Sequence, residues 1–231
     1  MRSRLSILAL VFTSWAAQAQ TQPAPQDLIL IQAFSQANVV SKEVAGNCAS
    51  IAVIKLAIGR YGADQVLEQV DTLATEYAVV LRDHKHLTLT KQEFISIDGL
   101  DRFVPQANPA IYKTARFLYA VMAKNKLLLH PEYSTVKAAA YDGGNYQLIP
   151  EAEANFTLLG LENSYQALPT QAAYTQSGVV VASERHVAYG GNGYYDEYGT
   201  AVSDQYFRSN HCKLITCSYP NRRIRYVYCL K

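Results

Sequence analysis

The sequence predicts an α+β protein whose first part is mainly helical and whose second part is a mainly antiparallel sheet. Apolar residues recur at helical spacing up to about residue 140, whereas short β-rich runs between glycine-containing turns dominate from Gly178 onward. Helices and strands that are segregated in this way along a chain are typical of α+β folds. One early helix is apolar on all sides, so we expect it to be buried between the two parts.

The first 19 residues, 1–19, are predicted to be a secretory signal peptide. Two arginines precede an apolar run that ends at Trp15, and an Ala-x-Ala cleavage pattern ends at Ala19. The apolar run is too short to cross a bilayer as a stable helix. We therefore expect a secreted or periplasmic protein with no stable membrane insertion after signal removal.

The rest of the chain is expected to form one domain. Residues 20–28 are rich in proline and glutamine and are predicted to be a disordered arm. Residues 29–231 are long enough for a single sizeable core. We expect a helical lobe over about 29–140 and a β lobe over about 141–231.

The charge of the mature chain is balanced. Signal removal takes away two arginines and no acid, so the 21 basic and 19 acidic residues of the full chain become 19 and 19. A formally neutral chain gives no support for a nucleic-acid partner.

The helix that follows Asn47 is the clearest local feature of the first part. Asn47 is a favoured N-cap residue, and Gly62 stands where a C-terminal cap belongs. Residues 49–58 between them are apolar except for Ser50 and Lys55. This composition predicts a helix that is buried on most sides.

Further helices are expected in the first part. Residues 63–81 place Val, Leu and Tyr side chains at spacings of three and four, which predicts an amphipathic surface helix. Thr90 and Glu93 form a capping box that opens a short helix. Asn108 and Pro109 combine an N-cap with proline at the first helical position, which indicates another helix start.

After a short helix at about 151–160, the pattern becomes that of strands. GGNG at 190–193 is a turn sequence, and the β-rich runs on either side of it predict a hairpin. The expected strands are 177–183, 185–190, 194–199, 213–219 and 223–229, of which the last two form a closing hairpin.

Cys48 stands at the first turn of the apolar helix, where free backbone N–H groups and the positive end of the helix dipole favour a thiolate. A cysteine hydrolase also needs a base and a group that orients the base. His186, in a β-rich run about 140 residues downstream, is the candidate base. Asp196, across the glycine-rich turn, is the first candidate for the orienting group, and Asp204 and Asn192 are the alternatives.

Three further cysteines, Cys212, Cys217 and Cys229, lie near the end of the chain. Export would place them in an oxidising compartment. A turn at Pro220-Asn221 would bring Cys212 opposite Cys229 and favours that disulfide. The remaining cysteine could reach Cys48, and such a disulfide is the structural alternative to a catalytic Cys48.

The segments around Cys48 and His186 resemble a known family. GNCAS at the start of the apolar helix, together with ERHVAYGG, resembles the papain-like cysteine peptidases. FLYAVMAKNK and AAAYDGG are similar to segments of the calpain branch, and the resemblance covers about residues 40–200. It implies that the nucleophile begins the central helix of one lobe and that the base lies on the barrel-like other lobe.

The chain departs from that family at two positions. The family carries a glutamine about six residues before the nucleophile to complete the oxyanion hole, and here that position is Lys42. The backbone N–H of Cys48 is expected to be one donor, with the side chain of Asn47 or Gln36 in place of the other. The tryptophan that the family places beside the third group is also missing, because the single tryptophan is Trp15.

The favoured function is an exported thiol hydrolase that cleaves a peptide or amide bond of a peptide or protein substrate through Cys48, His186 and Asp196. No cofactor or metal is required. Two alternatives remain open. A non-catalytic secreted binding protein would use the tyrosines of 189–198 as a ligand-facing surface. An acyl transferase of the transglutaminase type would use the same three residues and pass the acyl group to an amine.

Overall fold

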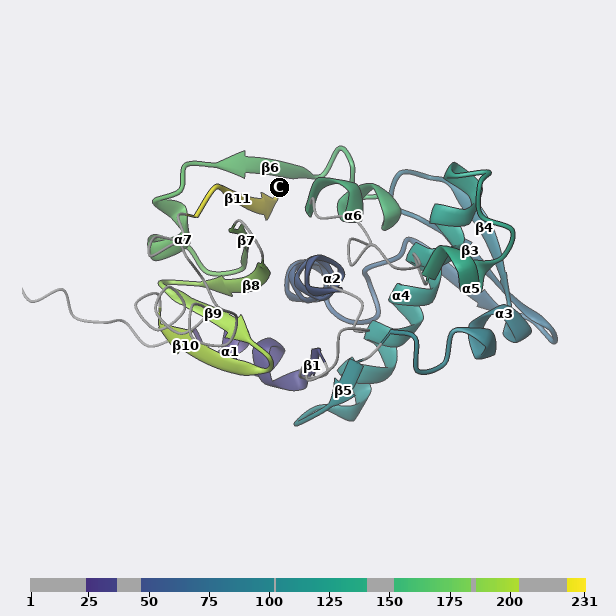
Figure 1. Cartoon of the computed structure of the whole chain (residues 1–231), viewed down its shortest axis with the longest axis horizontal. Helices are drawn as coiled ribbons and strands as arrows, with labels where there is room; N and C mark the ends of the chain where they lie inside the picture. Colours follow the sequence, from purple (N-terminus) through teal and green to yellow (C-terminus); the bar gives the residue numbers. More distant parts are fainter. Residues whose placement is uncertain (1–23, 37–46, 102, 141–151, 184–185, 204–223) are drawn as a thin grey trace, which may run out of the picture.

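The protein is an α+β structure with two halves that meet at one buried helix (Figure 1). A six-stranded antiparallel sheet forms one half, and helices with a small three-stranded sheet form most of the other. The computed structural model describes residues 24–36, 47–101, 103–140, 152–183, 186–203 and 224–231. The predicted mixed class of helices and antiparallel strands is therefore confirmed.

The larger sheet has the strand order β10-β9-β8-β7-β11-β6, and its described pairings are antiparallel. Sequential strands form hairpins from β7 to β10, while β11 lies between β7 and β6. The strands are β6 (Tyr165–Leu168), β7 (Val179–Ala182), β8 (Val187–Gly191), β9 (Tyr194–Glu197), β10 (Thr200–Ser203) and β11 (Tyr226–Leu230).

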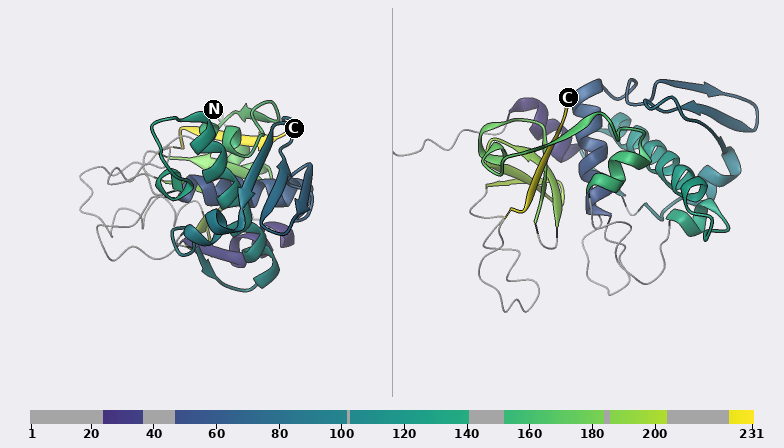
Figure 2. Two further views of the ribbon diagram at one scale, coloured as in Figure 1. Left: turned by 90° about the vertical axis from the view of Figure 1, so that its right-hand side faces the viewer. Right: turned by 90° about the horizontal axis from the view of Figure 1, so that it is seen from above.

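The other half is built around the long helix α4 (Pro109–Leu129). The order of its small sheet is β2-β3-β4, and Figure 2 shows this sheet at the end of the molecule farthest from the six-stranded sheet. The other helices and strands of the whole fold are α1 (Pro25–Ala33), β1 (Phe34–Gln36), α2 (Cys48–Tyr61), β2 (Gln69–Thr72), β3 (Glu76–Val80), β4 (His86–Thr90), α3 (Lys91–Ser96), β5 (Phe103–Pro105), α5 (Val136–Ala140), α6 (Ala152–Leu158) and α7 (Ala172–Thr175).

Helix α2 is the central element, and its burial follows from its apolar sequence. Residues 49–58 are all buried, as predicted. The helix packs against β7 and β8 on one side and against α4 and α6 on the other (Figure 1). The N–H of Gly62 donates to the Ile58 carbonyl at 2.8 Å and ends the helix. Burying this apolar surface from both halves is the main stabilising contribution of α2.

Two predicted helix starts are confirmed by their side-chain caps. The hydroxyl of Thr90 accepts from the Glu93 N–H at 3.0 Å, and the Glu93 carboxylate accepts from the Thr90 N–H at 2.8 Å. The side chain of Asn108 accepts from the Ile111 N–H at 3.1 Å, one residue before Pro109 opens α4. Each cap satisfies backbone donors that the first turn of a helix leaves without partners.

The predicted hairpin at GGNG is also confirmed. Gly191 pairs with Tyr194, so Asn192 and Gly193 are the two loop residues between β8 and β9. Their φ values are 54° and 79°, the left-handed conformation that a type I′ turn requires at both positions. This tight turn carries the chain directly from the strand after His186 into the strand that contains Asp196.

The predicted surface helix over 63–81 is wrong, because this segment contains β2 and β3 instead. Val70, Tyr77 and Val79 favour strands as much as they fit a helical spacing. In the structure β3 pairs with both β2 and β4, and Val79 is buried in the core. Pairing of β3 with β2 and with the next strand, β4, decides the outcome.

The predicted disordered arm over 20–28 is wrong for its last residues, because α1 begins at Pro25. Pro25 suits the first turn of a helix, and the side chains of Leu30 and Ile31 on α1 are buried in the core. Asp27 is 1% exposed and accepts hydrogen bonds from the six-stranded half. These contacts attach the start of the described chain to the fold.

The expected closing hairpin is described only in its second strand. β11 corresponds to the predicted strand 223–229, and it pairs with β6 and β7. The predicted strand 213–219 lies outside the described residues, as does the signal peptide. No helix in the described ranges combines the length and the apolar character needed to cross a membrane.

Candidate active site

Cys48 is the first residue of α2 and is half-buried. Its sulfur is hydrogen-bonded to the His186 side chain and accepts hydrogen bonds from the backbone N–H groups of Val187 and Ala49. A cavity of about 10 Å³ is lined by Cys48, His186 and Asp196 among others. That volume is roughly enough for one water molecule. The three residues predicted to form a catalytic site are therefore brought to one place.

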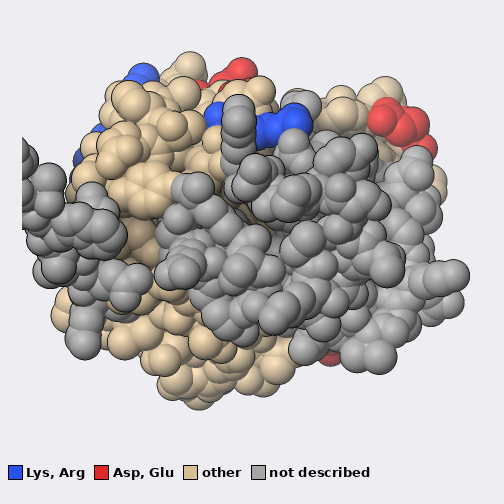
Figure 3. Space-filling view, turned by 60° about the vertical axis from the view of Figure 1, so that its left-hand side comes forward, with Lys and Arg blue, Asp and Glu red and all other residues tan. Residues whose placement is uncertain are grey.

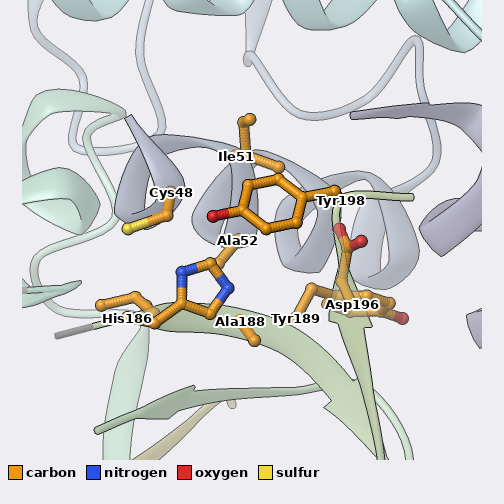
Figure 4. A pocket seen from close by; sticks show the side chains of 9 residues that line it. Cys48, Ile51, Ala52, His186, Ala188, Tyr189, Asp196 and Tyr198 are labelled. Atoms are coloured by element: carbon orange, nitrogen blue, oxygen red, sulfur yellow. The ribbon is translucent and has the colours of Figure 1, made fainter. Parts of the chain in front are cut away.

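His186 stands immediately before β8, an interior strand of the six-stranded sheet. The N–H and hydroxyl of Ser183 both donate to the His186 carbonyl, at 2.9 and 3.0 Å, and so fix its backbone. The residue is 8% exposed. In Figure 4 one ring nitrogen faces the sulfur of Cys48, and the other lies on the side of Tyr198 and Asp196.

The thiol and the imidazole shift each other's pKa. Burial raises the pKa of Cys48, but the hydrogen bond and positive charge of His186 outweigh burial and lower it below its ordinary value. Burial lowers the pKa of His186, but the hydrogen bond and negative charge of Cys48, with smaller effects of Glu197 and Asp196, raise it to about 9. Both shifts favour a thiolate–imidazolium pair near neutral pH.

Asp196 is held by groups other than His186 in the described contacts. Its Oδ2 accepts from the ammonium of Lys55 at 2.6 Å, and its Oδ1 accepts from the Gly199 N–H at 2.7 Å. Lys55 comes from α2 and has no exposed surface. Asp196 thus lies at the site, where it is paired with Lys55 of α2.

With this geometry described, the chain can be compared with known proteins. No family model matches it. No curated protein and no solved structure matches it either. The chemistry of the site is therefore argued from its own residues.

The two alternatives for the third group have different outcomes. Asn192 occupies the loop at the far end of the β8–β9 hairpin and is absent from the residues that line the Cys48 cavity. Asp204 lies outside the described residues. Asp196 remains the candidate that the described geometry favours.

The expected oxyanion donors are placed less favourably. Asn47 is fully buried, and its side-chain amide donates to the backbone carbonyl of Asp101, so this donor is already used. Gln36 is the last residue of β1, paired in register with Phe103. The role expected of Gln36 depends on its side chain, which lies outside the described part, as does Lys42.

Two residues of the site, Lys55 and Glu197, have no role in the sequence-based prediction, and Tyr198 has one only in the binding alternative. Lys55 is a polar exception in an apolar helix, and a charged residue in such a helix requires a buried partner. Glu197 adds negative charge beside His186. Tyr198 lines the cavity, and its ring centroid is 6.1 Å from that of His186.

Tyr198 owes its place over the site to a second type I′ hairpin. Glu197 pairs with Thr200, so Tyr198 and Gly199 are the loop residues between β9 and β10, with φ values of 50° and 84°. In Figure 4 the Tyr198 ring lies over His186 with its hydroxyl towards the Cys48 side. An aromatic ring therefore lies beside the imidazole.

Within the described residues, Cys48 and Cys229 are both free thiols. Cys229 lies on β11 and accepts a hydrogen bond from the Gln166 side chain at 3.3 Å. Cys212 and Cys217 lie outside the described residues. The favoured Cys212–Cys229 disulfide is therefore wrong, because the Cys229 thiol is free, and Cys48 is not in the disulfide considered as its alternative role.

The described surface and the described polar clusters give no sign of a metal site. The described part of the chain contains no group of three or more His, Cys, Asp or Glu side chains that could hold a metal ion. Seen from the side of the six-stranded sheet, most described residues are uncharged (Figure 3). Tyr189 and Tyr195 are 1% and 0% exposed, so they belong to the core and not to a ligand-facing surface.

Proposed function

We propose that this protein is an exported, papain-like thiol hydrolase that cleaves a peptide or amide bond. The observation that carries the proposal is the hydrogen-bonded pair of Cys48 and His186, with the thiol at the N-terminus of a buried helix and the imidazole at the start of an interior strand of the sheet. A thiol with a lowered pKa beside an imidazole with a raised pKa is the arrangement that cysteine nucleophiles need. Export rests on the signal-peptide pattern of residues 1–19.

The proposed reaction uses the pair twice. The thiolate of Cys48 attacks the substrate carbonyl carbon, and the carbonyl oxygen becomes an oxyanion. The imidazolium of His186 then gives its proton to the leaving amine, and a thioester remains on Cys48. Neutral His186 next takes a proton from water, which attacks the thioester and releases the acid. Asp196 supplies a negative charge beside the imidazole, which favours the protonated form of His186.

The oxyanion is expected to be held by backbone N–H groups at the start of α2. The first turn of a helix has N–H groups without intrahelical acceptors, and the dipole is positive there. The backbone N–H of Cys48 is the nearest of them to the reacting carbon in such an attack. The side chain of Asn47 is not proposed as the second donor, since it is bonded to Asp101.

A purely binding role is less well supported. That alternative relied on a tyrosine surface within 189–198, and two of those tyrosines are core residues. A binding protein would also have no use for a thiol whose pKa is lowered. Acyl transfer to an amine uses the same pair, so an added amine acceptor that accelerates substrate loss would favour transfer over hydrolysis.

The first test is the pH dependence of Cys48 alkylation by iodoacetamide in the mature protein. Peptide mass spectrometry would separate Cys48 from the other cysteines. We expect half-maximal reactivity well below about pH 8.5, the ordinary value for cysteine. In His186→Ala the midpoint should rise above that value, because burial remains and the positive partner is lost. His84→Ala is the matched control, since His84 is exposed and paired with Glu68 far from the site.

An unchanged midpoint in His186→Ala would overturn the proposal. Activity on peptide substrates should follow the same pair. The rate should rise as the Cys48 thiolate forms below about pH 8.5, and it should fall as His186 loses its proton near pH 9. The fall follows because a neutral imidazole has no proton to give to the leaving amine.

A further inference from the structure

Lys55 is an unusual residue for its position. It lies in the middle of α2, surrounded by apolar side chains, and its side chain is 0% exposed. Lysine is almost never fully buried unless it is paired. Burial lowers the pKa of Lys55 and the charge of Asp196 opposes that shift. A buried ion pair is weak evidence for stability, because desolvation offsets the attraction.

The hydrogen bonds of Lys55 are complete. Its three ammonium hydrogens have three acceptors: the Ile31 carbonyl at 2.9 Å, the Phe34 carbonyl at 2.6 Å and the Asp196 carboxylate at 2.6 Å. The two carbonyls belong to α1 and β1, and they fix the position of the ammonium. The third contact fixes Asp196.

Lys55 also lies on the face of α2 that carries the nucleophile. Cys48, Ala52 and Lys55 are spaced by four and three residues, which places them along one helix face. Cys48 and Ala52 line the site cavity together with Asp196. The helix that presents the thiol therefore also carries the cation that binds the carboxylate next to its base.

A comparison within the same fold argues that the lysine is not needed simply to bury a carboxylate. Asp27 is 1% exposed, and its described partners are all neutral: the hydroxyls of Tyr189 and Ser177 and the Gly178 N–H. Neutral donors are thus sufficient at one buried aspartate. A full positive charge is used at the other, which lies beside the imidazole.

We propose that Lys55 is a positioning residue of the site, which holds Asp196 beside His186 through a fully buried ion pair anchored on α1 and β1. The inference rests on the proposed thiol chemistry, and it adds a fourth side chain to that chemistry. Lys55 acts through Asp196 and has no role in contacting the substrate. Without Lys55 the carboxylate would be buried with its Oδ2 lacking a counter-charge, and it would either take up a proton or move away from His186.

The test is the titration of the His186 ring, followed by NMR in the full mature chain. The charged groups around that ring are Cys48, Glu197 and Asp196, with Tyr198 packed against it. Wild type should titrate near 9. Asp196→Asn should lower the midpoint by about one pH unit, because a negative charge beside the imidazolium is lost. Lys55→Met should lower it by the same amount, and the double variant should lower it no further.

A matched control separates position from mere burial. Lys126 on α4 is also buried, at 3% exposure, and packs over the Tyr133 ring away from the site. Lys126→Met should weaken the fold without moving the His186 titration. If Lys55→Met leaves the titration unchanged, or if its shift adds to that of Asp196→Asn, Lys55 does not act through Asp196.

A failure of Lys55→Met to fold is also informative. If Lys55→Met unfolds while the neutral pair Lys55→Met with Asp196→Asn folds, the lysine is needed because of the Asp196 charge, as proposed. If both unfold, its role lies in the Ile31 and Phe34 contacts and the inference is overturned. A wild-type His186 that titrates near its ordinary value of about 6.5 would instead contradict the proposed function, whatever the stability of the variants.

Discussion

The two ends of α2 carry the same kinds of groups in different surroundings. At the N-terminal end, Cys48 and Asp196 line a cavity of about 10 Å³. At the C-terminal end, Cys229 and Asp27 line a cavity of about 290 Å³. Each end thus has a thiol and a buried carboxylate, and Tyr189 contributes to the lining of both cavities.

The difference between the ends lies in the charged partners. Asp27 is bound by neutral donors. Burial, and after it the charge of Asp27, raises the pKa of the Tyr189 hydroxyl, which therefore stays protonated. Asp196 is bound by an ammonium and lies beside an imidazole that also contacts a thiol. The smaller cavity therefore has the groups for nucleophilic catalysis, while the larger one has a carboxylate that ties α1 to the sheet. By size alone, the larger cavity at the C-terminal end would be the first candidate for a site.

The largest expected effect separates the two thiols. Cys48→Ala should reduce hydrolysis by about 10⁴-fold or more, because it removes the nucleophile. Cys229→Ala at the other end should retain activity. Hydrolysis rates of both purified variants on the same peptide substrate would measure this. Equal rates for the two variants would mean that the N-terminal end is not the reacting one.

A smaller effect is expected at the carboxylate of the C-terminal end. Asp27→Asn should lower the free energy of unfolding by about 1–3 kcal/mol, because it disturbs buried hydrogen bonds to a charged acceptor. It should leave the pH midpoint of Cys48 alkylation unchanged. Urea unfolding and the alkylation profile provide the two measurements. A shifted alkylation midpoint would show that the two ends are electrostatically coupled.

The smallest effect concerns the cover of the N-terminal end. Tyr198→Gly should fold as well as wild type, because glycine accepts the φ of 50° that tyrosine adopts there. Without the ring, the cavity beside His186 should open. A bulky maleimide should then gain several-fold in its rate with Cys48 relative to iodoacetamide. No change in that ratio would mean that the ring does not restrict access.

Local sequence signals predicted several elements well. The capping box at Thr90 and the start of α4 at Pro109 depend on neighbouring residues, and each was found where its signal lies. Helix α2 also begins at Cys48 as expected, but the Asn47 side chain does not cap it and bonds to Asp101 instead. The Asn192-Gly193 turn was predictable for the same reason, since left-handed backbone favours these residue types. Such features are determined by interactions within a few residues.

The failures are of another kind. Residues 63–81 fit a helical spacing, but β2 and β3 within this segment pair with each other, and β3 also pairs with the next strand, β4. The arm up to residue 28 looks polar and flexible, but its contacts with the six-stranded half hold it from Pro25 onward. Backbone pairing and tertiary contacts outweighed weak local preferences in these two cases.

The features of the site also divide into those that the local sequence predicts and those that tertiary contacts decide. The sequence alone identified the thiol by its place at a helix start, the histidine by its strand and distance, and Asp196 by a turn. The tertiary structure alone assigned Asp196 to Lys55 and placed Tyr198 over the imidazole. A helix start is a property of adjacent residues. The partner of a buried charge depends on which segments of the chain pack around it, since burial and ion pairing exist only after packing.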